Sequence, residues 1–278
     1  MNQNDRFAKH SWVSLRRNVS VVRWMNKIGR GFLEFSNNTG GIAYLFKDTL
    51  TVMFQTKLRL GATYDQLNKI GSQSFHLVFF TALFTGMVLA LQSAYQLRLF
   101  AAEQFTSDLV SLSITRELGP VLTAMVVAGR VGASIAAEIG TMKVTEQIDA
   151  LKALAVDPIR YLVVPRFVAA LAALFLLTIY SDVIGITGGY IIVVFKLGMS
   201  PHQYISRSLD VLMIKDVMTG LIKAFFFGGM IALAGCYYGF KAEGGAEGVG
   251  RATTIAVVTA LIMIIASDAL FTAIFYFF

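Results

Sequence analysis

Residues 75–97, FHLVFFTALFTGMVLALQSAYQL, decide the fold class of this chain. The run contains no Lys, Arg, Asp or Glu. A helix needs about 20 consecutive apolar residues to cross a hydrocarbon core about 30 Å thick. The stretch therefore predicts a transmembrane helix, and the next question is how many more the chain contains.

The composition of the whole chain also indicates a membrane protein. Of its 278 residues, 56% are hydrophobic and 15% are charged, and the mean hydropathy is +0.64. An ordinary soluble domain is about 45–50% apolar and about 25% charged. A soluble globule of this size could not bury so much apolar surface, so the bilayer is the expected solvent.

Four further apolar runs follow the first, at about 118–140, 158–197, 217–240 and 252–278. The run at 158–197 is ambiguous because 40 residues would form a helix roughly 60 Å long. It predicts either one long helix, bent at Gly185, Gly188 and Gly189, or two short spans. The chain is thus expected to be an all-α integral membrane protein with five or six spans.

The distribution of basic residues predicts the orientation. With five spans and a cytoplasmic N-terminus, 17 of the 24 Lys and Arg lie in cytoplasmic segments and 5 in outer segments. With six spans the counts become 18 and 4. Basic residues accumulate on the cytoplasmic side of membrane proteins. The N-terminus is therefore predicted to be cytoplasmic, but charge does not choose between five and six spans.

Residues 1–70 form an N-terminal cytoplasmic or interfacial region, and residues 71–278 form the transmembrane domain. The first 30 residues contain no apolar core typical of a removable signal peptide. The stretch Val21–Ile28 places apolar groups beside cations and a tryptophan, which predicts a helix in the headgroup layer. The alternative is a cytosolic helix packed on the rest of the protein.

Motifs for enzyme chemistry are absent from the sequence. Cys236 is the single cysteine and the three histidines are dispersed, so no metal site is expected. Neither GxxxxGK[ST] nor GxSxG occurs, so no catalytic residue is predicted and nucleotide hydrolysis would need another polypeptide. The basic residues flank apolar runs, a pattern that favours an anionic membrane surface over nucleic acid.

Small residues recur every four positions in the second span, at Ala124, Ala128, Gly132, Ala136 and Gly140. Such a stripe lets another helix approach closely. Gly185/Gly189 and Gly235/Gly239 repeat the pattern. These stripes predict tight helix packing more than a particular function, and the glycine-rich segment 241–250 is expected to be a loop.

Ionisable residues inside spans are costly and are functional candidates by default. Five of them are expected at similar depth in the outer leaflet: Arg116, Glu117, Asp216, Lys223 and Asp268. They predict a polar ring that receives a zwitterionic or anionic headgroup. The alternative is a set of internal salt bridges that hold the bundle together.

The loop between the second and third spans, residues 141–158, predicts a short amphipathic helix at about 144–155. Val144, Ile148, Leu151 and Ala155 recur at helical spacing. Thr145 is the expected N-cap of this helix, and Asp157 the expected N-cap of the third span, with Pro158 in its first turn. Such a helix either docks a soluble partner or lies in the interface unoccupied.

The segment RELGPVLTAMVVAGRVGASIAAEIGTMKVTEQIDALKALAVDP, residues 116–158, resembles the MlaE/Mce-associated permease family of lipid ABC transporters. A second matching piece is RATTIAVVTALIMIIASD at 251–268, and the resemblance covers roughly residues 40–278. It implies five spans, one long third segment, and a permease that moves phospholipids between the bacterial inner membrane and the outer envelope. The C-terminus would then be periplasmic.

The resemblance also implies partners and site residues. The expected partners are a second copy of the chain, a cytoplasmic ATPase that binds ATP and Mg, a periplasmic MCE-domain subunit and a small STAS-domain subunit; the chain itself would hold no cofactor. The coupling helix matches Thr145–Leu154, with the ATPase-coupling residues Thr145, Glu146, Gln147, Ile148, Asp149 and Leu151. The lipid cavity of the dimer is expected to be lined by Leu89, Leu97, Phe100 and Leu118, beside the five outer-leaflet charges.

Two other classes of function remain as alternatives. A secondary transporter would be expected to show inverted repeats, and none are visible in the sequence. A purely structural membrane anchor for an envelope complex would not need charges inside its spans. A co-purifying ATPase would separate the permease from both.

Overall fold

The computed structural model describes Gly29, Leu33 and residues 36–277. The predicted interfacial helix at Val21–Ile28 lies outside the described residues. The chain divides into two compact units, Met1–Lys47 and Asp48–Phe278. In the first unit residues 36–47 are helical; the second unit contains the membrane spans and is described below. The division predicted at residue 70 stays a prediction.

Within the described residues, five helical segments are long and apolar enough to cross a membrane, and no strand is present. This confirms the all-α membrane fold and the choice of five spans. The first segment joins α2 (Leu60–Gly71), a 3₁₀ turn η1 (Ser72–Ser74) and α3 (Phe75–Arg98). Thus the predicted span at 75–97 agrees with α3 almost residue for residue.

The second segment is longer than the predicted 118–140 and runs from Glu103 to Val144. It consists of η2 (Glu103–Phe105), α4 (Thr106–Ser113), η3 (Ile114–Leu118), α5 (Gly119–Val127), η4 (Ala128–Gly132) and α6 (Ala133–Val144). Both η3 and η4 are π-helical turns. Such turns are rare and often occur at functional sites. The sequence analysis did not predict α4, because polar residues such as Ser107 and Asp108 interrupt its apolar run.

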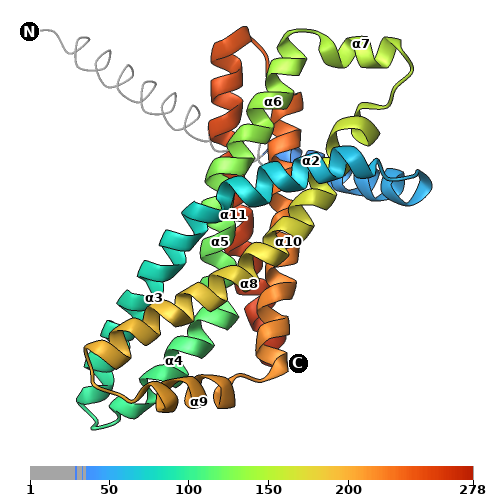
Figure 1. The fold of residues 1–278 in the computed structure, drawn as a ribbon. Coiled ribbons are helices and arrows are strands. Elements are labelled where there is room, and N and C mark those ends of the chain that lie inside the picture. Colours follow the sequence, from blue (N-terminus) through green and yellow to red (C-terminus); the bar gives the residue numbers. More distant parts are fainter. Residues whose placement is uncertain (1–28, 30–32, 34–35, 278) are drawn as a thin grey trace, which may run out of the picture. The chain divides into compact units, whose positions relative to one another are not determined.

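The remaining spans follow in order: the π-helical turn η5 (Ile159–Val163) with α8 (Val164–Phe195), then α10 (Ile214–Phe240) and α11 (Gly245–Phe277). Two short helices connect them, α7 (Gln147–Ala153) before α8 and α9 (Pro201–Val211) after it. These short helices lie at opposite ends of the bundle (Figure 1). We call these ends the α7 end and the α9 end.

The third span is one continuous helix, so the alternative of two short spans is wrong. Gly185 and Gly188 are contact points with α3. A Cβ on Gly86 of α3 would overlap the carbonyl oxygen of Gly185, and a Cβ on Gly188 would overlap that of Leu83. Backbone therefore packs directly on backbone along this pair, as small residues allow in membranes.

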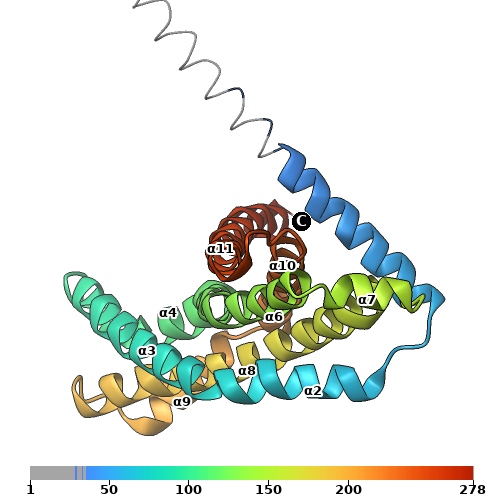
Figure 2. The ribbon, with the colours of Figure 1, turned by 90° about the horizontal axis from the view of Figure 1, so that it is seen from above.

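The predicted stripe of small residues in the second span is also an interhelical contact, and all five of its residues are buried. A Cβ added to Gly239 of α10 would lie only 2.8 Å from Ile139 Cβ, and one on Gly235 would lie 2.9 Å from Ile135 Cγ2. α10 therefore sits tightly against α6. Figure 2 shows α10 and α11 on one side of this span, with α3 and α8 on the other.

The glycine-rich segment is mostly helical, which corrects the predicted loop at 241–250. α11 begins at Gly245, so only residues 241–244 connect it to α10. Gly244 and Gly245 have φ angles of 85° and 71°, which side chains rarely adopt. These two glycines make the turn, and the later ones continue as helix.

Candidate functional site

A cluster of charged side chains, some buried and some partly exposed, lies where η3, α10 and α11 meet, toward the α9 end. At its centre is Lys223 of α10, whose side chain is 0% exposed. Its Nζ donates to Glu117 Oε2 at 2.6 Å and to Thr272 Oγ1 at 2.7 Å, and lies 3.0 Å from Asp268 Oδ1. The Lys223 ammonium is thus surrounded by oxygen atoms from two other spans.

Local packing explains how these groups meet. Gly220, one turn before Lys223, touches the second span so closely that a Cβ there would overlap the carbonyl oxygen of Thr115. Thr115 lies in the π-helical turn η3, which also carries Arg116 and Glu117. Lys223 donates to the backbone carbonyl of Arg116 at 3.3 Å as well. The glycine contact thereby brings the cation of α10 against the charged turn.

Arg116 and Asp216 form a second ion pair beside the first. Arg116 Nη2 lies 2.6 Å from Asp216 Oδ1, and the Asp216 side chain is almost fully buried. The other oxygen of Asp216 accepts from the backbone N–H of Met213 at 3.0 Å, which caps the start of α10. All five charges that the sequence placed at one depth therefore lie in two adjacent ion-paired groups.

An apolar groove of about 320 Å³ adjoins the cluster. It is lined by Phe84, Thr85, Val88, Leu89, Gln92 and Leu118. Leu118 directly follows Glu117, so the groove and the charges share the same π-helical turn. Of the predicted lipid contacts, Leu89 and Leu118 line this groove. Leu97 and Phe100 do not, because they lie at and beyond the end of α3; their contact with lipid stays a prediction.

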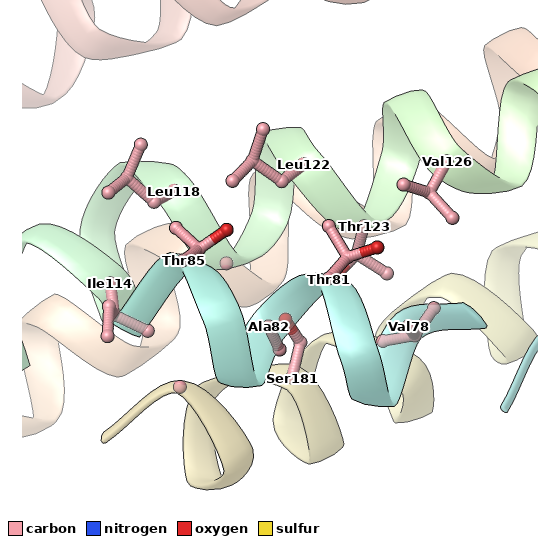
Figure 3. A pocket seen from close by; sticks show the side chains of 12 residues that line it. Val78, Thr81, Ala82, Thr85, Ile114, Leu118, Leu122, Thr123, Val126 and Ser181 are labelled. Carbon is pink, nitrogen blue, oxygen red and sulfur yellow. The ribbon is translucent and has the colours of Figure 1, made fainter. Parts of the chain in front are cut away.

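A small cavity of about 10 Å³ lies deeper, between α3, α5 and α8. Figure 3 shows its walls, with Thr81, Thr85, Thr123 and Ser181 among the labelled side chains. Thr85 and Leu118 line both this cavity and the groove. A space of this size is comparable to a single water molecule.

The short helix predicted at about 144–155 is present at the opposite end as α7 (Gln147–Ala153), and its coupling role stays a prediction. Ile148 is buried, whereas Thr145, Glu146, Gln147 and Asp149 are exposed and Leu151 is half-buried. The predicted cap is wrong: Glu146 occupies the N-cap position, and Thr145 Oγ1 instead donates to the Thr141 carbonyl at 2.7 Å. The predicted cap of the third span is confirmed, since Asp157 accepts from the backbone N–H of Ile159 at 3.0 Å.

Electrostatics keep the exposed surface of α7 charged. Asp149 lies 3.2 Å from Lys143 Nζ and 3.3 Å from Lys152 Nζ. Hydrogen bonds from Lys143 and Lys152, together with their charges, lower the pKa of Asp149 below its ordinary value. The helix is bracketed by Glu146 and Ala155, whose φ angles of 60° and 56° are left-handed. Non-glycine residues rarely adopt this conformation, so the position of α7 is held by strained turns.

The structure also shows an ion-paired group near the α7 end that the sequence did not reveal. Arg166 of α8 is buried and lies 2.8 Å from Glu138 of α6, which in turn lies 3.4 Å from Lys69 of α2. The 17 Lys and Arg assigned to cytoplasmic segments in the sequence analysis include Arg166, because it stands at the edge of an apolar run. The intramembrane Glu138 was the available signal that a cation was needed nearby.

Five apolar spans, with buried charges beside an apolar groove, define a polytopic membrane protein of the transporter type. The chain matches the family described as permease MlaE over residues 63–274. It belongs to the MlaE permease family.

Three relatives illustrate the range of the similarity. A probable ABC transporter permease protein of Rickettsia typhi is 44% identical over 90% of this chain and 97% of its own length. The intermembrane phospholipid transport system permease protein MlaE of Haemophilus influenzae is 34% identical over 92% and 98%. The chloroplastic protein TRIGALACTOSYLDIACYLGLYCEROL 1 of Arabidopsis thaliana is 34% identical over 79% and 63%.

Proposed function

We propose that this chain is the permease subunit of an ABC-type transporter that moves phospholipids between the inner membrane and the outer envelope. The observation that carries the proposal is that one π-helical turn, η3, holds both Glu117 of the charge cluster and Leu118 of the apolar groove. A phospholipid has a charged headgroup joined to apolar chains. The site offers both kinds of surface side by side, in a chain of the MlaE permease family.

The balance of charge favours a headgroup that carries an ammonium. The two ion-paired groups contain two cations, Arg116 and Lys223, and three carboxylates, Glu117, Asp216 and Asp268. Glu117 keeps 41% of its side chain exposed, so its carboxylate remains available to a ligand. A zwitterionic headgroup would place its ammonium near Glu117 and its phosphate near the half-exposed Arg116. The acyl chains would follow the groove.

The α7 end is proposed to face the cytoplasm and the α9 end the periplasm, in the bacterial inner membrane. Positive-inside counting supports this orientation. It places the N-terminus inside and the C-terminus of the five-span chain outside. The exposed side of α7, with Glu146, Gln147 and Asp149, would then contact a separate ATPase that binds ATP and Mg.

The remaining subunits of the proposed complex follow from the family. A second copy of the chain would complete the lipid cavity, and a periplasmic MCE-domain subunit would receive or deliver the lipid. A STAS-domain subunit would bind on the cytoplasmic side. The Haemophilus relative is named for phospholipid transport, which supports phospholipid as the substrate.

The test is ATP-dependent lipid transfer by the purified complex. The chain is affinity-purified from membranes, co-purifying proteins are identified, and the complex is reconstituted into phospholipid vesicles. We expect an ABC ATPase to co-purify and transfer to require ATP. Transfer driven by an ion gradient without ATP would instead indicate a secondary transporter. Absence of both transfer and ATPase would indicate a structural anchor.

A further inference from the structure

Asp182 is a buried carboxyl group in the middle of α8 that the proposed lipid site does not use. Its residue is 8% exposed. Its Oδ1 lies against Gly119 of α5, so closely that a Cβ on Gly119 would overlap this oxygen and lie 3.1 Å from Asp182 Cγ. The carboxyl group is therefore enclosed by the backbone of the second span, one residue beyond the π-helical turn η3.

Among the described residues Asp182 forms no ion pair, and its Oδ1 has no hydrogen-bond partner. α5, which packs against it, has no titratable side chain, and α3 has only His76, Tyr95 and Arg98, near its ends. Four cations of the other neighbouring helices are paired elsewhere: Arg116 with Asp216, Lys223 with Glu117 and Asp268, Arg207 with Asp108, and Arg166 with Glu138.

The groups on the facing helix surfaces are neutral hydroxyls. Thr178 precedes Asp182 by four residues on α8, and Thr123 follows Gly119 by four on α5, so each pair shares a helix face. Both threonines are buried and their hydroxyl oxygens have no hydrogen-bond partner. Ser181 lines the small cavity beside them. These facing helix surfaces therefore carry polar atoms near Asp182 but no charge.

An unpaired carboxylate in such surroundings is strongly disfavoured, and a buried acid without a counter-ion takes up a proton instead. A metal cation would need several more oxygen ligands around Oδ1, but the Gly119 backbone occupies that side. We propose that Asp182 is a proton-binding site, held as a neutral carboxylic acid at the contact between the second and third spans. The proposal is independent of the lipid that the permease carries.

Infrared spectroscopy tests the proposal on the purified complex. The difference spectrum between wild type and Asp182→Asn at pH 7 should contain the C=O stretching band of a protonated carboxyl group. The matched control, Asp210→Asn, changes an exposed aspartate of α9 and should show only carboxylate bands. A carboxylate band at Asp182 would overturn the proposal. So would a protonated band that disappears when sodium replaces choline in the buffer, because that would indicate a cation site.

Thermal stability gives a second, independent readout. The folded chain would hold a proton that an unfolded aspartate releases above about pH 4. The folded-to-unfolded ratio of wild type relative to Asp182→Asn should therefore fall by up to about tenfold per pH unit as the pH rises. Melting temperatures between pH 6 and 9 should diverge accordingly. Parallel curves would contradict the proposal, as would failure of the neutral, nearly isosteric Asp182→Asn variant to assemble.

Discussion

Lys223 and Glu117, 106 positions apart in the sequence, meet at 2.6 Å with the lysine fully buried and the glutamate partly exposed. This difference in exposure distinguishes the environments of the two residues. The lysine is enclosed and neutralised by protein oxygens, whereas the carboxylate also faces outward. Internal pairing, one of the two alternatives that the sequence presented, is therefore observed, whereas contact of Glu117 with a headgroup stays a prediction.

Lys223→Met should destabilise the permease and reduce lipid transfer together. The substitution leaves Glu117 and Asp268 without their shared cation, and breaking a buried pair costs about 3–5 kcal/mol. Melting temperature and transfer should be measured on the same preparations. An unchanged melting temperature would show that the cluster does not stabilise the fold.

Glu117→Gln should impair transfer while the melting temperature stays within a few degrees of wild type. The amide still accepts a hydrogen bond from Lys223, and Asp268, 3.0 Å from Lys223 Nζ, remains as the counter-ion of the buried lysine. The proposed contact with a headgroup ammonium would nevertheless be lost. Parallel losses of stability and transfer would reject a direct role of Glu117 with lipid.

A photo-crosslinking residue at Val88 should capture lipid retained by the detergent-purified permease. Val88 lines the apolar groove and is 51% exposed. The matched control is Val183 of α8, which is 59% exposed but does not line the groove. We expect several-fold more lipid adduct at Val88, quantified by mass spectrometry. Equal labelling would mean that the groove is not a preferred lipid site.

The double variant Glu146→Lys, Asp149→Lys should weaken ATPase association by about tenfold, or about 1.4 kcal/mol. It reverses two exposed charges on α7 and removes the pairing of Asp149 with Lys143 and Lys152. Charge reversal of Glu103 and Asp210, both toward the α9 end, is the control. Co-purified ATPase and coupled hydrolysis are measured. Equal effects of the two double variants would argue against α7 as the docking element.

Tyr204 connects the short helix α9 to α8, and this contact should weaken at alkaline pH. Tyr204 is buried and its hydroxyl donates to the Ile186 carbonyl at 3.0 Å. Burial raises the pKa of Tyr204 to about 12. The neutral form therefore stabilises the fold below about pH 10, and this stability is lost as the pH rises toward 12.

Tyr204→Phe should cost about 1 kcal/mol through the lost hydrogen bond. It should also remove the decrease in stability between pH 10 and 12. Denaturation curves for both proteins across this pH range provide the measurement. A wild-type decrease that persists in Tyr204→Phe would place the titrating group elsewhere.

The sequence predicted the features that depend on the bilayer and missed those that depend on packing. Length and hydropathy located α3 and the apolar run that forms α8, because the hydrocarbon thickness sets a minimum run of apolar residues. They left one or two spans open in that run, and the family resemblance indicated one. The depth of Lys223 and Asp268 in their runs predicted that they would meet. The π-helical turn at 114–118 has no sequence signature; in the structure, Thr115 of this turn packs against Gly220, and Gly119 just beyond it against Asp182. Arg166 was misplaced for a similar reason: its burial depends on Glu138 from another helix.

Where Gly86 meets Gly185 and Leu83 meets Gly188, no side chain separates α3 from α8. Layers of side chains are what allow packed helices to slide by changing rotamers, whereas touching backbones can only separate or stay together. α3 and α8 should therefore move together as one rigid body during a transport cycle. Conformational change would then be confined to the segments that flank this rigid body, among them the strained turns at Glu146 and Ala155. A force applied at one membrane surface would reach the other through this pair with little loss.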